Sequence, residues 1–303
     1  MIVNSIQILK NAKKNKYAIG AFNFTTLEQL KAIIKASQET NMPVILATSE
    51  SAIKFMGIEN IVDLVTNEVY ESDIPYVLHL DHGKNFEICK LCIDAGYSSV
   101  MIDASYLPFE ENIALTKKVV DYAHAFNVSV EGELGKIQGI EDEVNSKYSI
   151  YTNPDDAVKF INETGVDSLA ISIGTSHGAY KFKGESKLNI ELLKQIDEKT
   201  NHFPLVLHGA SSLSDKLLEN FEKSGGEIAN AKGVSANNLT DAIQNGICKI
   251  NVDTDLRLAF TTGVRNSLKN LSVFNLREYL ENGMNETTNE VKDHISLFLN
   301  KKD

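Results

Sequence analysis

The sequence contains no tryptophan, five prolines and three cysteines among its 303 residues. So few cysteines, and an odd number of them, argue against a disulfide framework and for a reducing compartment. The chain also lacks a run of about 18 apolar residues, so nothing in it predicts a membrane-spanning helix. Its first residues lack the apolar run and small-residue cleavage site of a signal peptide. We therefore expect a cytoplasmic protein that does not associate with a membrane.

Positive charge is also scarce, because the formal net charge is −11 and no long basic cluster occurs. Nucleic acid is therefore excluded as an expected partner. An anionic substrate would need local lysine, arginine and backbone N–H groups to bind it against the overall field. Hydrophobic residues make up 43% of the chain, enough for a substantial core, and the length suits two ordinary domains or one large α/β barrel.

Short apolar segments alternate with amphipathic segments of helix length along most of the chain. Eight of these segments resemble buried strands: 17–24, 43–49, 76–80, 98–102, 128–134, 166–173, 203–207 and 247–252. Near-continuous apolar strands separated by helices indicate a parallel sheet covered on both faces. Eight such units in about 250 residues predict a single (β/α)8 TIM barrel domain spanning residues 1–303.

Three segments depart from this pattern. Residues 135–153 are polar and follow the fifth strand, and a connection of this length predicts a mobile, functional loop. Residues 224–238 are polar and rich in glycine, and we interpret them as a surface insertion in the seventh unit. Residues 273–300 have a helical pattern and predict a C-terminal helical extension beyond the barrel.

Polar side chains gather where the predicted strands end. They are Asn23, Ser49, Asp81, His82, Glu131, Glu133, His208, Ser211, Asn251, Asp253 and Thr254, together with residues 174–178 after the sixth strand. In a (β/α)8 barrel the carboxyl ends of the strands converge on one face, and the chemistry lies there. Asp81 and His82 leave an extended strand on opposite sides, but both can reach one cleft if the backbone turns as the strand ends.

His82, His177 and His208 share one context, because each follows an apolar strand. Three neutral imidazoles with an open fourth position make a catalytic zinc site. The alternative is that one or more of them are core or capping histidines. Because three occur in one context on three strands, we favour the metal site.

The residues beside these histidines suit a phosphate. In the motifs SHG and HGAS, glycine follows the histidine directly and lets a ligand approach the backbone closely. The predicted phosphate cradle contains Gly178, Gly209, Ser211, Asp253 and Thr254, with Lys181 adding positive charge. For any single one of these residues, ordinary turn chemistry is the alternative explanation.

Taken together, these motifs resemble one family. They read HLDH at 79–82, VEGELG at 130–135 followed by IED at 140–142, SHG at 176–178, LVLHGAS at 205–211 and KINVDTD at 249–255. In this order and spacing they are similar to the metal-dependent (class II) fructose-bisphosphate aldolases and the related tagatose-bisphosphate aldolases. The resemblance runs the length of the chain.

The resemblance implies roles for residues around the metal. His82, His177 and His208 match the zinc ligands, and Glu133 matches a carboxylate near the metal. Asp81 matches the carboxylate that exchanges a proton with the C4 oxygen. Glu141 matches the residue that moves the proton on the dihydroxyacetone phosphate carbon, and it lies in the loop after strand five.

The resemblance also implies a substrate site. Asn251 matches a residue that holds the enediolate, and Asn23 is assigned to substrate binding with it. The residues that match the dihydroxyacetone phosphate site are Gly178, Lys181, Gly209, Ser211, Asp253 and Thr254. Ser49 and Arg277 match positions for the distal phosphate. Family members also bind a monovalent cation, Na+ or K+, near a phosphate.

The implied function is zinc-dependent cleavage and condensation of fructose 1,6-bisphosphate, with dihydroxyacetone phosphate and glyceraldehyde 3-phosphate as the three-carbon partners, in a homo-oligomer such as a dimer or tetramer. Tagatose 1,6-bisphosphate is the alternative substrate, and Asp253 favours fructose because tagatose relatives often carry a small apolar residue there. More distant alternatives are a barrel metallohydrolase and a non-enzymatic sugar-phosphate-binding protein.

Overall fold

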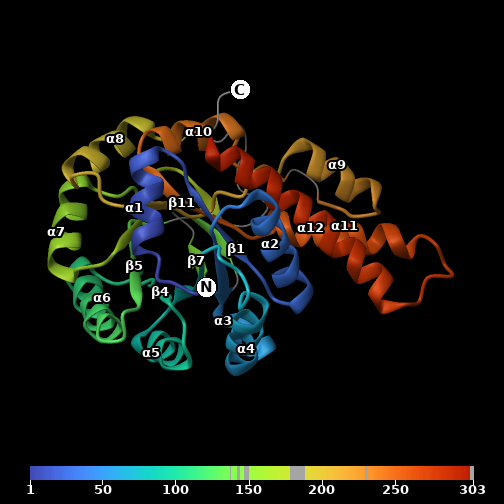
Figure 1. Ribbon diagram of the computed structural model, residues 1–303. Coiled ribbons are helices and arrows are strands. Elements are labelled where there is room, and N and C mark those ends of the chain that lie inside the picture. Colours follow the sequence, from blue (N-terminus) through green and yellow to red (C-terminus); the bar gives the residue numbers. More distant parts are fainter. Residues whose placement is uncertain (137, 142–143, 147–149, 178–187, 229–230, 301–303) are drawn as a thin grey trace.

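The computed structural model describes residues 1–303 except 137, 142–143, 147–149, 178–187, 229–230 and 301–303, and it gives only the backbone of 138–141, 144–146 and 177. Eight parallel strands close into a barrel in the order β1-β11-β10-β8-β5-β4-β3-β2 (Figure 1). The strands are β1 Ile19–Asn23, β2 Val44–Ser49, β3 Tyr76–Gly83, β4 Ser99–Ile102, β5 Ser129–Leu134, β8 Ser168–Ile171, β10 Leu205–Leu207 and β11 Ile247–Val252. The predicted (β/α)8 barrel is therefore confirmed, and each expected strand lies within its predicted segment or extends it by a few residues.

Helices surround this barrel (Figure 1). They are α2 Leu27–Thr40, α3 Glu50–Met56, α4 Ile58–Glu68, α5 Phe86–Ala95, α6 Phe109–His124, α7 Pro154–Thr164, α8 Ile190–Lys199, α9 Asp215–Lys223, α10 Ala236–Gln244, α11 Thr254–Leu268 and α12 Leu276–Leu299. Side-chain caps start several of them, as where the hydroxyl oxygen of Thr26 accepts from the N–H of Gln29 and the side chain of Asn153 accepts from Asp155 and Asp156. Such caps satisfy N–H groups that a helix leaves without partners.

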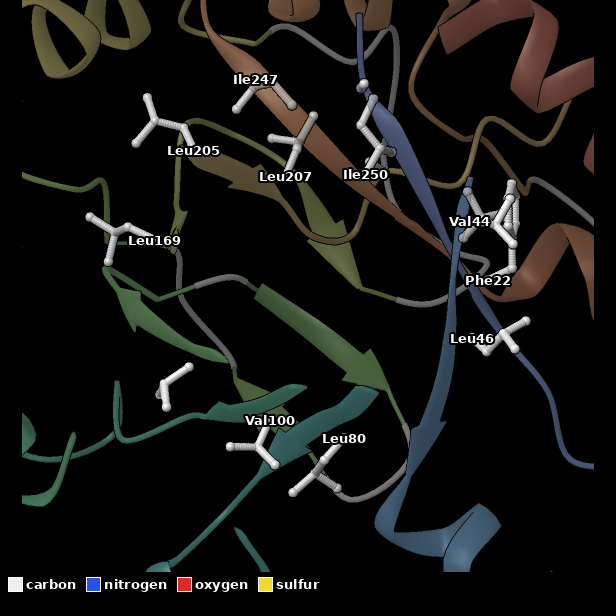
Figure 2. Close-up of a cluster of buried hydrophobic side chains, with 14 of the residues drawn as sticks. Phe22, Val44, Leu46, Leu80, Val100, Leu169, Leu205, Leu207, Ile247 and Ile250 are labelled. Atoms are coloured by element: carbon white, nitrogen blue, oxygen red, sulfur yellow. The ribbon is translucent and has the colours of Figure 1, made fainter. Parts of the chain in front are cut away.

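The main core lies between the strands and the helices. Leu46, Leu80, Val100, Leu207 and Ile250 project from successive parts of the barrel into this layer (Figure 2). Alternate residues of the same strands face the barrel interior, where Met101, Ala170 and Val206 form a small apolar cluster. Strands buried on both faces explain why the sequence shows continuous apolar runs rather than a period of two.

A further helix, α1 Ile6–Asn15, packs against interior residues of the barrel. Ile8, Leu9 and Ala12 from this helix form one cluster with Ile19, Ala21, Ile45, Val77 and Cys248. The helix closes the end of the barrel at which the strands begin. The opposite end is left for polar side chains.

The segment expected as a loop at 135–153 contains strands. Within it, β6 Gln138–Glu141 pairs antiparallel with β7 Val144–Ser146 and parallel with β9 Ser176–His177. The local polar composition did not indicate this pairing, because β9 comes from a distant part of the sequence. The pairing places the backbone that carries Glu141 beside the backbone that carries His177. The mobility of the segment stays a prediction.

The segment at 224–238 is less superficial than its composition indicated. Ser224, Ala231 and Val234 are buried, and Ala231 joins an apolar cluster with Leu213 and Leu258. The segment lies between β10 and β11, in the seventh unit, and its interpretation as a surface insertion stays a prediction. A few small apolar residues among polar ones are enough to attach the segment to the barrel.

The C-terminal extension is a hairpin of α11 and α12 that projects beyond the barrel (Figure 1). The two helices approach closely at Gly263, where an added Cβ would lie 2.3 Å from the carbonyl oxygen of Asn282. Leu271 and Phe274, in the connection between the helices, are 97% and 88% exposed. No helix in the described part of the chain is long and apolar enough to cross a membrane.

We predict that Leu46→Ala lowers the free energy of unfolding by about 2–5 kcal/mol, because it removes a fully buried side chain from the layer between strands and helices. Chemical denaturation followed by circular dichroism measures this. Leu91→Ala on α5 is the control, since Leu91 is 48% exposed, and we expect a loss below about 1 kcal/mol. Equal losses in the two variants would contradict the assignment of the core.

Candidate active site

The end of β3 turns sharply at His82, whose φ is 53°. A non-glycine residue rarely adopts this left-handed conformation outside a turn or a constrained site. The turn lets the adjacent side chains of Asp81 and His82 point toward the same place. Their ligand atoms, with one of His208 from the end of β10, all lie within 4.8 Å of one another, and all three residues are buried.

His82 is oriented by a carboxylate from the next strand. Its Nδ1 lies 3.0 Å from Oδ2 of Asp103, which directly follows β4. Oδ1 of Asp103 accepts hydrogen bonds from the N–H and hydroxyl of Ser105. Burial alone would lower the pKa of His82, but the Asp103 hydrogen bond and the Asp81 and Glu133 carboxylates raise it well above its ordinary value. A carboxylate on Nδ1 leaves Nε2 of His82 directed at the site.

His208 is oriented in the same way by Glu131 on β5. Its Nε2 lies 2.8 Å from Oε1 of Glu131, and the other oxygen of Glu131 accepts from Nζ of Lys249 at 2.7 Å. Burial would raise the pKa of Glu131, but Lys249 and His208 hold it well below the usual range. Burial and the neighbouring His82 lower the pKa of His208. Glu131 therefore stays ionised and keeps the proton of His208 on Nε2.

His79 completes this buried chain beneath the site. Its Nε2 lies 3.2 Å from Nζ of Lys249, and its Nδ1 lies 2.8 Å from the hydroxyl of Ser99. Burial and the Lys249 charge lower the pKa of His79 to about 3. The ring is therefore neutral, accepts from Lys249 and donates to Ser99.

The rings of His82 and His208 each direct one nitrogen atom at the other ring. Nε2 of His82 and Nδ1 of His208 are 2.8 Å apart, and the other nitrogen of each ring is held by a carboxylate. With both rings neutral, two lone pairs would face each other, so a proton or a cation has to lie between them. This arrangement of buried imidazoles with carboxylate partners fits a divalent metal ion.

Asp81 is held by two amides. Nδ2 of Asn23 donates to one carboxylate oxygen at 2.8 Å, and Nδ2 of Asn251 donates to the other at 2.9 Å. These residues come from the neighbouring strands β11 and β1 and from β3, which is separated from β1 by β2. The two hydrogen bonds fix the carboxylate beside the histidines without neutralising its charge, as a proton-transferring group requires.

Glu133 lies on the other side of His82. Its Oε2 is 3.8 Å from Nδ1 of His82, and the side chain is buried. Burial and the nearby Asp103 raise the pKa of Glu133 well above its ordinary value. Glu133 is therefore a buried carboxyl group beside the Nδ1 side of the His82 ring, and it holds a proton more readily than an exposed glutamate does.

The structure places other predicted residues at the same end of the barrel. Gly209 follows His208 with a φ of 60°, and Ser211 is buried two residues later. Asp253 precedes α11 and pairs with Arg257 through contacts of 2.8 Å, and Thr254 begins that helix. Ser49 ends β2 and caps α3.

Several predicted residues are not brought to this cluster by the described structure. Gly178 and Lys181 lie outside the described residues, as do the side chains of Glu141 and His177. Arg277 lies in the first turn of α12, which begins at the projecting end of the hairpin (Figure 1).

Sequence reasoning missed the residues that orient the histidines. Asp103 and Lys249 are not among the predicted site residues, and Glu131 is predicted only as a polar residue near a strand end, without a partner. One available signal is spacing, because Glu131 and Lys249 each lie two residues before an interior polar residue on the same strand.

The chain is similar to known proteins over nearly its whole length. Residues 3–303 match the protein family described as fructose-bisphosphate aldolase class-II. The chain is 46% identical over 302 residues to the fructose-bisphosphate aldolase of Helicobacter pylori (strain ATCC 700392 / 26695), with 98% of each chain covered. It is 45% identical over 296 residues to that of Giardia intestinalis, covering 96% of this chain and 91% of that protein. The YdjI aldolase of Escherichia coli K12 has a similar structure, with a TM-score of 0.82 at 30% identity over 98% of this chain and 97% of that chain.

We predict that metal uptake by the metal-free protein releases a proton and weakens as the pH falls. The raised pKa of His82 means that both nitrogens of its ring carry a proton at neutral pH, and a metal has to displace the proton on Nε2. Below that pKa, the apparent association constant should fall about tenfold per pH unit. Calorimetric titration with Zn2+ between about pH 6 and about pH 8, in buffers of different ionisation enthalpy, measures both effects.

Asp103→Asn is the matched variant for this titration, because it removes the charge that raises the pKa of His82 and keeps the side-chain shape. We expect it to bind metal about 10- to 100-fold more weakly and to release fewer protons. An affinity that does not depend on pH would contradict the assignment of His82.

Proposed function

Because the chain belongs to the class II fructose-bisphosphate aldolases, we propose that the cluster of Asp81, His82 and His208 is the centre at which it cleaves and forms fructose 1,6-bisphosphate. The family is metal-dependent and acts on sugar phosphates. The observation that carries the proposal is the pair of facing imidazole nitrogens, each fixed by a carboxylate, beside a carboxylate held by two amides.

The metal in this proposal is zinc. His82 and His208 would hold it together with His177, whose role rests on the resemblance of its motif, and Glu133 lies close enough to adjust the charge around it. Bound zinc supplies Lewis-acid stabilisation of the negative charge that develops on substrate oxygen as the C3–C4 bond breaks, an effect of several kcal/mol. Asp103 and Glu131 keep the histidine protons away from the metal side of each ring.

Two carboxylates divide the proton transfers. Asp81 takes the proton from the C4 hydroxyl during cleavage and returns it during condensation, and its amide partners keep it in place throughout. Glu141 moves the proton at the dihydroxyacetone phosphate carbon. The strand that carries Glu141 pairs with β9, so its backbone lies beside the backbone of His177.

The substrate phosphates bind at the neighbouring strand ends. One phosphate lies at Gly209 and Ser211 and at the N-terminus of α11 with Asp253 and Thr254, where backbone N–H groups favour an anion. Gly178 and Lys181 complete that phosphate site, and a monovalent cation (Na+ or K+) binds near the distal phosphate. The side-chain amides of Asn23 and Asn251, which hold Asp81, also contact oxygen atoms of the sugar. Ser49 and Arg277 bind the distal phosphate.

We predict that the purified protein cleaves fructose 1,6-bisphosphate with a higher kcat/KM than tagatose 1,6-bisphosphate. Removal of metal with a chelator should abolish cleavage, and zinc should restore it. A coupled assay that reduces the triose phosphate product with NADH measures both substrates side by side. Full activity in protein confirmed to be metal-free would contradict the metal mechanism, and a preference for tagatose 1,6-bisphosphate would contradict the substrate.

Asp81→Asn is the control that separates proton transfer from metal binding. It preserves the size of the side chain and one oxygen acceptor, so we expect one zinc ion per chain and a kcat lower by about 10²- to 10⁴-fold. Turnover close to that of the wild type would remove Asp81 from the mechanism.

We also propose that the chain forms a homo-oligomer, a dimer or a tetramer, through the projecting hairpin. Leu271, Phe274 and Leu276 are largely exposed there, and Arg277 follows them directly. Packing against a second copy would bury these apolar side chains. In such an oligomer, Arg277 would lie away from its own barrel and close to the distal phosphate that is bound in the barrel of the second copy.

We predict that Leu271→Ser combined with Phe274→Ser lowers the mass measured by sedimentation and raises KM for the bisphosphate. Tyr70→Ser is the control, because Tyr70 is 83% exposed but follows α4 rather than the hairpin. A monomeric wild type, or a double variant that keeps the wild-type mass, would contradict this arrangement.

A further inference from the structure

The segment that follows β10 is fastened by a buried carboxylate. Oδ1 of Asp255, in the first turn of α11, accepts from the N–H of Leu213 at 2.8 Å and from the hydroxyl of Ser212 at 3.3 Å. Asp255 is fully buried, and Leu213 has a left-handed φ of 46°. A leucine in this conformation is strained, so the hydrogen bond to Asp255 helps to maintain the turn.

Both apolar packing and polar contacts hold this segment, and Leu213 is buried in a cluster with Phe221 and Leu258. A cavity of about 950 Å3 borders Ser212, Leu213 and Gly233 and extends to His294. On one side the N–H of Val234 donates to the carbonyl oxygen of Ser211 at 3.0 Å. A side chain at Gly233 would collide with the backbone of Ser212, since an added Cβ would lie 2.2 Å from its carbonyl oxygen. On the side that borders the cavity, where packing partners are missing, the polar contacts add to the packing of Leu213 in fixing the shape of the segment.

His294 of α12 reaches Asp255 from the far side. Its Nε2 lies 3.5 Å from Oδ1 of Asp255 and 3.4 Å from Oε1 of Glu290, and the ring is 2% exposed. Both contacts are longer than an ordinary hydrogen bond, so the attraction combines weak hydrogen bonding with the opposite charges of the ring and the carboxylates. Burial alone would lower the pKa of His294, but Asp255 and Glu290 outweigh it and raise the pKa to about 10. The ring is thus a cation at neutral pH and compensates the buried charge of Asp255.

We propose that His294 is a positioning residue for substrate phosphate, which acts through Asp255 on the segment from Gly209 to Leu213. The buried cation keeps Asp255 ionised and in place, Asp255 fixes the Ser212–Leu213 turn, and the turn sets the backbone at Gly209 and Ser211. The inference rests on the proposed phosphate site at Gly209 and Ser211. It gives the C-terminal helix a part in substrate binding although His294 does not touch the substrate.

The experiment compares His294→Gln with the wild-type protein, using inorganic phosphate as the probe. Calorimetric titration should show a dissociation constant for phosphate about 3- to 30-fold higher in His294→Gln. KM for fructose 1,6-bisphosphate should rise to a similar extent, with kcat changed by less than about 2-fold. Zinc content should be unchanged. Unaltered phosphate affinity in the folded variant would overturn the proposal.

Two further variants separate charge from folding. Val291→Ala, three residues earlier on α12 and fully buried, should lower thermal stability without changing phosphate affinity or KM. His294→Lys retains a positive charge and should bind phosphate more tightly than His294→Gln. The proposal fails if Val291→Ala weakens phosphate as much as His294→Gln does, or if the lysine variant is no better than the glutamine variant.

If His294→Gln does not fold, Asp255→Asn gives the same test, because it keeps an oxygen acceptor for Leu213 and removes the charge that His294 pairs with. The same rise in the phosphate dissociation constant is expected, and an unchanged constant would overturn the proposal. Phosphate binding and aldolase turnover are read separately. A wild type that cleaves the bisphosphate but shows the same phosphate affinity as every variant would refute the role of His294 and leave the proposed function standing.

Discussion

Charge buried inside the barrel is the constraint on which the site depends. A carboxylate or ammonium group without a partner in such an interior costs several kcal/mol, so each charge has to be met by another. Lys249 meets Glu131, and Glu131 meets His208, which fixes the direction of the nitrogen that faces His82. The orientation of the His208 ring, a proposed metal ligand, is therefore set by a lysine that the ring does not touch. Asp103 does the same for His82 through one contact. Such a site is ordered before metal or substrate arrives, and little reorganisation is left for the reaction.

The sequence was enough to predict the barrel and the strand ends, because both follow from local pattern. Apolar runs separated by amphipathic helices determine the fold class, and a polar residue at the end of a run identifies the catalytic end. Pairing inside the barrel does not follow from local pattern. Glu131 and Lys249 come from β5 and β11, which are separated by β8 and β10 in the closed sheet, so they meet across the interior. Only the register of the closed barrel brings these two side chains together, and spacing along the chain does not encode it.

Local composition also does not indicate the backbone pairing and the few apolar contacts that shape two further segments. Residues 135–153 are polar, but their backbone forms strands because β9, some forty residues away, offers an edge. Residues 224–238 are polar and rich in glycine, but Ala231 and Val234 attach them to the core, and the N–H of Val234 holds the carbonyl of Ser211. Composition reports how well side chains tolerate water. It does not show which backbone carbonyl groups elsewhere in the fold accept hydrogen bonds from the N–H groups of a segment.

The contacts of the C-terminal helix α12 also do not follow from its local sequence pattern. From its sequence, α12 is an extension beyond a complete barrel, but His294 near its end is buried against Asp255, and Asp255 holds the turn after β10. Arg277 lies in the first turn of the same 24-residue helix, at the end of the hairpin that projects from the barrel (Figure 1). A continuous helix transmits position along its length, since each turn is hydrogen-bonded to the next. In the proposed oligomer, the first turn of α12 contacts the substrate of a second copy, and its last turns hold the segment from Gly209 to Leu213 in its own copy. Contact between the copies and the shape of the phosphate site are then linked through α12. The packing of α11 and α12 at Gly263 is close enough to hold that element in register with the barrel.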